Sequence, residues 1–176
     1  MLPDRYAWLA REPGPRMLVE ALKMYGTFEK PGSANNPTIL AWAKEVGGEV
    51  EDVFLADSIP WCGLFMAVVA KRAGEEPPAH PLWALSWSAF GAKAGTPALG
   101  DVLVFTRNGG GHVALYVGDD HDAFHCLGGN QSDRVCVTRI AKSRLYTARR
   151  PLYRVQPANV RSIHLDTAGA LSLNEA

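Results

Sequence analysis

The sequence predicts one α+β domain, with helices in the first half of the chain and a mostly antiparallel sheet in the second. Three patterns carry this prediction. Apolar residues recur at helical spacing over 16–25 and 37–46. The stretch 60–70 is apolar on every side and is followed by a basic turn and a glycine at 71–74, as expected of a buried helix. Beyond residue 100, short β-rich runs alternate with turn residues.

Each amphipathic helix has sequence signals at its ends. Gly26 stops the first helix. Asn36 suits the N-cap position of the second helix and Pro37 its first turn, while the glycine pair at 47–48 ends it. The polar segment 27–36 between them is expected to be a surface loop, or else to line a substrate groove.

The second half of the chain is predicted to form about five strands. They are expected at 101–106, 112–118, 122–127, 134–140 and 147–154. Short turns join most of them, so the sheet should be antiparallel, with the helices packed on one face. We expect the domain to span 1–155, with a core at 15–153, and a C-terminal extension at 156–176.

Composition excludes several classes of function. The 176 residues are 47% hydrophobic and carry no net formal charge, which disfavours nucleic acid as a partner. No run is apolar enough to insert into a membrane, and 1–5 lacks the basic start of a secretory signal. We therefore expect synthesis in the cytoplasm and, for any target outside it, release or delivery by another system.

Cys62 is the predicted nucleophile because it opens the apolar helix. Unpaired backbone N–H groups and the helix dipole favour a thiolate at this position, so we expect the pKa of Cys62 to be lowered. The alternative is a small buried side chain that only packs. A nearby base decides between the two interpretations.

His112 is the candidate base. It opens the second strand of a predicted hairpin, after the glycine run at 109–111, and shares one strand face with Ala114 and Tyr116. A cysteine on a buried helix, followed by a histidine that opens a strand, indicates a Cys–His pair.

A third polar group should orient the imidazole of His112. Asn130 is the first choice, because a neutral amide can accept the ring N–H; His125 and Gln131 are the rivals. The glycines and asparagine of 128–131 could equally serve only as turn residues.

Cys126 and Cys136 flank this turn almost symmetrically, so a disulfide across a hairpin is one interpretation. Zinc bound by these cysteines with His125 and His112 is another, although no paired ligand spacing supports it. We expect no metal and no cofactor. Among the aromatic residues, Trp83 or Trp87 could wall a cleft, or be buried against the sheet.

The segments 57–62, 100–105, 111–113 and 127–133 together resemble the NlpC/P60 and CHAP superfamily of papain-like cysteine peptidases. The similarity is strongest to a small phage-associated branch with a WC...GHV...GGNQ pattern, and it covers about 15–153. It implies a papain-like fold that hydrolyses amide bonds of peptidoglycan, with Cys62 as nucleophile, His112 as base and a polar third residue aligned with Asn130. Many NlpC/P60 members have a second histidine as the third group, and CHAP members often have a glutamate before the asparagine. Here glycines precede Asn130, so the third residue stays open.

The resemblance also implies the setting of the reaction. The enzyme would be an endopeptidase or an N-acetylmuramoyl-L-alanine amidase, acting as a phage lysin or as an antibacterial effector. Its partners would be the peptide stem of peptidoglycan and, for an effector, an immunity protein and delivery machinery; we expect a monomer. The alternatives are an inactive wall-binding module and a papain-like acyltransferase or deamidase acting on a protein. The residues expected to bind substrate are Trp61, Asp57, Tyr116, Gln131 and Trp87.

Overall fold

The structure is a computed structural model that describes residues 1–166 and 169–173. Its helical elements are η1 (Asp4–Arg11), α1 (Arg16–Lys23), α2 (Pro37–Val46), α3 (Glu49–Val53), α4 (Cys62–Ala73), η2 (Ala84–Ala89) and η3 (Lys142–Arg144), the three η elements being 3₁₀ helices. Its strands are β1 (Ala92–Lys93), β2 (Val102–Arg107), β3 (Gly110–Asp119), β4 (Ala123–Gly128), β5 (Cys136–Ala141) and β6 (Leu145–Arg150). The α+β class is confirmed.

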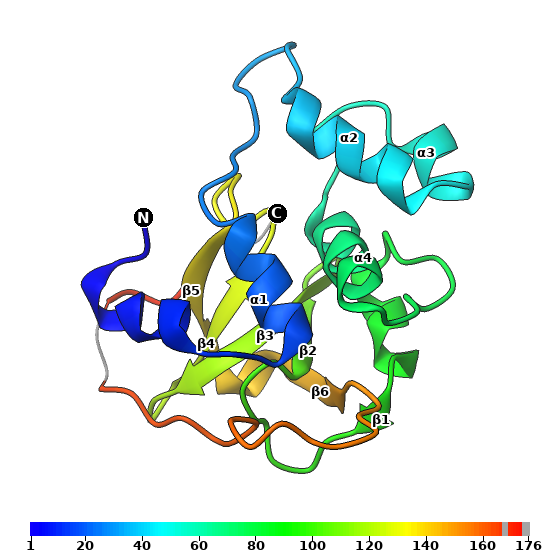
Figure 1. Cartoon of the computed structure of the whole chain (residues 1–176). Helices are drawn as coiled ribbons and strands as arrows, with labels where there is room; N and C mark the ends of the chain where they lie inside the picture. Colours follow the sequence, from blue (N-terminus) through cyan, green and yellow to red (C-terminus); the bar gives the residue numbers. More distant parts are fainter. Residues whose placement is uncertain (167–168, 174–176) are drawn as a thin grey trace.

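The strands form one six-stranded antiparallel sheet in the order β1-β6-β2-β3-β4-β5. Helices α1 and α4 lie across it, while α2 and α3 extend beyond its end (Figure 1). The two-residue strand β1 adds an edge that the sequence does not predict, because so short a segment has no alternating pattern. Among the described residues, no helix is both long and apolar enough to cross a membrane.

Helix α2 begins and ends where the sequence predicts. The Asn36 side chain accepts a hydrogen bond from the Thr38 N–H at 2.9 Å, and Pro37 occupies the first turn. Helix α4 ends at Gly74, whose φ of 82° is left-handed, a conformation that glycine adopts without strain.

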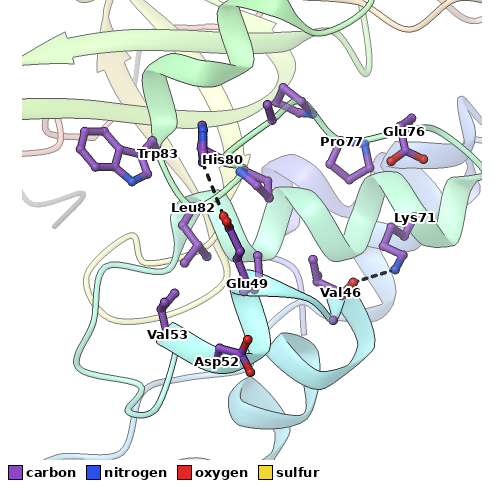
Figure 2. A pocket seen from close by; sticks show the side chains of 15 residues that line it. Val46, Glu49, Asp52, Val53, Lys71, Glu76, Pro77, His80, Leu82 and Trp83 are labelled. Carbon is purple, nitrogen blue, oxygen red and sulfur yellow. Dashed lines mark hydrogen bonds and ion pairs between the residues drawn. The ribbon is translucent and has the colours of Figure 1, made fainter.

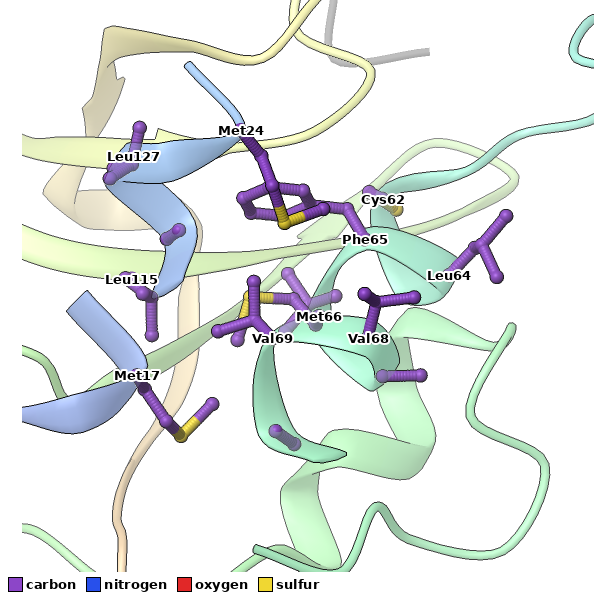
Figure 3. Close-up of a cluster of buried hydrophobic side chains, with 14 of the residues drawn as sticks. Met17, Met24, Cys62, Leu64, Phe65, Met66, Val68, Val69, Leu115 and Leu127 are labelled. Atoms are coloured by element: carbon purple, nitrogen blue, oxygen red, sulfur yellow. The ribbon is translucent and has the colours of Figure 1, made fainter. Parts of the chain in front are cut away.

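Helix α4 lies in the centre of the main hydrophobic core. Every residue from Cys62 to Ala70 is buried. Figure 3 shows Met66 and Val69 among side chains from α1 and the sheet, including Met17 and Leu115. The apolar character of this helix on all sides therefore reflects burial on all sides, as predicted.

The opposite face of the sheet has a smaller core cluster. Its members alternate along each strand with those of the main core, and include Leu103, Phe105, Tyr116, Phe124 and Cys126. The segment after β6 also packs against the sheet. Asp119 pairs with this segment through backbone hydrogen bonds with Ile163 and Leu165, both 2.8 Å.

A buried polar network links η1 to β4 and β5. The Tyr6 hydroxyl lies 2.6 Å from Nδ1 of His125, and the opposite ring nitrogen lies 2.8 Å from Oδ2 of Asp120. Arg139 donates to both oxygens of Asp120, at 2.7 and 3.1 Å. His125, a rival for the third group of the site, is therefore committed to this network. Hydrogen bonds to Asp120 hold the pKa of that carboxyl well below its usual range, Arg139 contributing most.

Candidate active site

Cys62 is the first residue of α4 and its side chain is almost fully enclosed, since the residue is 4% exposed. Hydrogen bonds from the backbone N–H groups of Val113, Gly63 and Cys62 itself favour the thiolate. Burial outweighs them and raises the pKa of the thiol. The expected lowering of the Cys62 pKa is therefore wrong, because a sequence shows the helix N-terminus but not the depth of enclosure.

Alkylation of Cys62 by iodoacetamide is expected to be slow at neutral pH and to accelerate as pH rises beyond the ordinary pKa of an exposed thiol. The reason is that only the thiolate reacts, and burial disfavours it. Peptide mapping of the alkylated protein over a pH series separates Cys62 from the other two cysteines. A rate that is already at its plateau below pH 7 would show a thiolate in the resting protein instead.

His112 is wholly buried near the start of β3, opposite Phe105 of β2. The backbone N–H of Val113, the residue after His112, favours the Cys62 thiolate, so the thiol lies beside this part of β3. The pairing of β3 with β4 starts only at Leu115. The turn after β4 and the first turn of α4 occupy the space beside 112–114.

Gln131 fixes the imidazole of His112. Its Oε1 lies 3.1 Å from Nε2 of the ring. Its amide nitrogen donates to the carbonyls of Cys126 and Cys136, at 3.2 and 2.6 Å, which determines the orientation of the amide. Because the amide presents its oxygen to His112, the neutral ring carries its proton on Nε2, and Nδ1 is the basic nitrogen.

The two glycines before Asn130 are required by close packing. A Cβ on Gly128 would lie 2.8 Å from the Ala114 side chain and 2.9 Å from Oε1 of Gln131. A Cβ on Gly129 would lie 2.5 Å from the Phe65 side chain. The glycine pair therefore lets the turn approach both β3 and α4, which turn chemistry alone does not explain.

Asn130 lies one residue before Gln131 in this turn, is 3% exposed and has a left-handed φ of 55°. It remains in the candidate site as a neighbour of the residue that contacts His112. Gln131 is one of the two rivals that the sequence offers for the third position, and its hydrogen bond to Nε2 of His112 favours it. A GGNQ pattern leaves the choice open, because two consecutive amides in a turn cannot be told apart by spacing.

Most residues predicted to bind substrate are enclosed in this structure. Trp61 and Trp87 are 0% exposed, Tyr116 and Asp57 1%. The Asp57 carboxylate accepts hydrogen bonds from the backbone N–H groups of Lys30 and Asn36, at 3.0 and 2.7 Å, and so fixes the loop before α2. The hydroxyl of Tyr116 donates to Asp119 at 2.7 Å.

Other side chains line the surroundings of the site. A Cβ on Gly111 would lie 2.8 Å from the Leu85 side chain, so η2 borders His112. On the other side, Trp61 donates its indole N–H to Glu29 at 3.3 Å. Glu29, with residues 132–134 just after Gln131, lines a cavity of about 410 Å³. Burial raises the pKa of Glu29.

None of the three cysteines, Cys62, Cys126 and Cys136, forms a disulfide. Cys126 is opposite Thr138, and Cys136 is opposite Gly128, so the two cysteines are offset along the hairpin rather than paired. The disulfide interpretation is therefore wrong for this structure. Within 1–166 and 169–173, no three His, Cys, Asp or Glu side chains are grouped so that they could hold a metal ion.

No protein-family model matches the chain, and no curated protein matches it either.

Proposed function

We propose that the protein is a papain-like cysteine hydrolase that cleaves amide bonds of peptidoglycan. One observation carries the chemistry: Gln131 fixes the tautomer of His112, and the next residue, Val113, donates its N–H to the sulfur of Cys62. These contacts, on two neighbouring residues of β3, support a nucleophile, a base and an orienting amide that act together. The sequence resemblance supports the substrate class.

The reaction begins with a neutral pair of side chains, since burial disfavours the free thiolate. Nδ1 of His112 accepts the thiol proton as the sulfur of Cys62 attacks the amide carbonyl. The N–H of Cys62, at the helix N-terminus, stabilises the oxyanion. The C–N bond then breaks, His112 protonates the leaving amine, and water hydrolyses the thioester.

The cavity beside Glu29 supports a peptide substrate. It is bordered by charges of both signs, from Glu29, Asp133 and Arg134, and by Phe28, which is 58% exposed. A peptide stem carries both free amino and free carboxyl groups, so both signs of charge can be matched. We place the stem here, next to Trp61 and hence next to Cys62.

Gln131→Ala is expected to lower kcat by about 10²-fold with little change in KM, because an unoriented His112 is a poor base. Asn130→Ala is the matched comparison, since it removes the neighbouring amide of the same turn. Activity on purified peptidoglycan measures both, and the ¹⁵N shifts of the His112 ring report whether Nε2 has lost its partner. A larger loss of kcat in Asn130→Ala would assign the third role to Asn130.

A further inference from the structure

A second, larger cavity adjoins the site, with a volume of about 780 Å³. It lies between α3, the end of α2 and the proline-rich connection 76–83 (Figure 2). Neither the catalytic groups nor the charged cavity beside Glu29 contribute to its lining. The proposed reaction does not use this cavity.

The wall of this cavity touches the helix turn that carries Cys62. A Cβ on Gly63 would lie 2.4 Å from the carbonyl oxygen of Pro81 and 2.5 Å from that of Leu82, so the connection passes directly over the residue after the nucleophile. Three residues after Leu82, the Leu85 side chain reaches Gly111, beside His112. The segment 81–85 therefore borders both the cavity and the catalytic groups.

The lining of this larger cavity combines a solvent-exposed aromatic side chain with hydrogen-bond acceptors. Trp83 is 74% exposed, whereas Trp87 nearby is fully buried. Figure 2 shows the carboxylates of two α3 residues, Glu49, which lies 3.8 Å from Nδ1 of His80, and Asp52. The one lysine of the lining, Lys71, donates to the carbonyls of Glu45 and Val46, at 3.0 and 2.9 Å.

This chemistry suits a neutral, hydroxyl-rich ring. The C–H bonds on one face of a sugar pack against an indole, and its hydroxyl groups donate to carboxylates. The same carboxylates would repel a phosphate or another anion. The charged groups of a peptide stem are better matched at the other cavity, where Arg134 stands beside the acidic residues.

We propose that the cavity lined by Trp83 binds a sugar of the glycan strand, so that Cys62 cuts the amide that joins the stem to N-acetylmuramic acid. This inference rests on the proposed function. The lactyl carbonyl of the sugar forms the thioester with Cys62, and its C–N bond breaks. The released alanine amine takes the proton from His112 and leaves on the side of Glu29; water then returns the lactyl carboxylate.

The test is binding of the disaccharide N-acetylglucosaminyl-N-acetylmuramic acid to the Cys62→Ala protein, followed by the NMR signals of the tryptophan indole N–H groups. We expect the Trp83 signal to shift, and Trp83→Ala to weaken binding by about tenfold. Tyr146→Ala, which removes another exposed aromatic residue from β6, should bind as the parent does.

The outcomes separate the two proposals. Failure of the disaccharide to bind, while the wild-type protein still hydrolyses peptidoglycan, overturns the sugar site and leaves the hydrolase. Binding of a free stem peptide at Trp83 in place of the disaccharide also overturns it. Disaccharide binding without any hydrolysis by the wild type supports the sugar site and removes the proposed reaction.

Discussion

Cys62→Ala is expected to reduce turnover of peptidoglycan by about 10⁴-fold or more, because it removes the only atom that forms the covalent intermediate. The fold should survive the change. The sulfur fills a small part of the core beside the first turn of α4, and its loss leaves a space of about one atom. Turnover is measured by release of soluble fragments, and folding by circular dichroism and Tm.

Cys62→Ser is the companion variant. It keeps a hydrogen-bonding atom at the position that receives the N–H of Val113, but its hydroxyl is a far weaker nucleophile. Both variants should therefore be inactive and folded. Near wild-type turnover in either folded variant would remove Cys62 from the mechanism.

Asp120→Asn is expected to lower the free energy of unfolding by about 3–5 kcal/mol, the cost of breaking a buried ion pair on one side only. Arg139 is 6% exposed and would keep its charge beside a neutral amide. His125, 2.8 Å from the same carboxylate, would lose the acceptor that fixes its ring. Urea unfolding at neutral pH measures the change.

The effect should fade in acid. Asp120 has a pKa well below its usual range in the folded protein, so its contribution to stability is complete above the pKa of an unfolded aspartate, about 3.9, and is lost as pH falls from there. The wild type and Asp120→Asn should therefore converge toward low pH. Asp122→Asn, an exposed carboxylate two residues away, is the control and should change stability little. Equal losses in the two variants would contradict a special role for the network.

The fold class, the helices α1, α2 and α4 and the main strands could be predicted from the sequence because each has a strong local pattern. Helix α4 is apolar on every side, and the hairpin of β2 and β3 has a glycine-rich turn. Strand β1 and helix α3 have two and five residues, too few for a period to show. The packing of Ile163 and Leu165 beside Asp119 depends on long-range contacts that no local pattern encodes.

The candidate site was predictable in its residue types and less so in its geometry. Cys62 and His112 can be picked out from the sequence because one opens a predicted helix and the other opens a predicted strand, which fixes where each reactive side chain lies in the fold. The choice of Gln131 over Asn130 depends on the carbonyls of Cys126 and Cys136, which only the folded turn brings to the amide. Exposure was the hardest property to predict. Trp83 and Trp87 belong to one aromatic stretch, yet the side chain of Trp83 is exposed and that of Trp87 is buried.

Digestion of purified peptidoglycan by the wild-type protein, with Cys62→Ala in parallel and the fragments identified by mass spectrometry, tests the central claim most directly. Fragments are expected from the wild type alone, as free stem peptides with an alanine amino terminus and glycan strands that have lost them. Cuts only within the stem would keep the cysteine hydrolase and contradict the sugar site. No fragments from the wild type under reducing conditions, or equal fragments from both proteins, would contradict the proposed function itself.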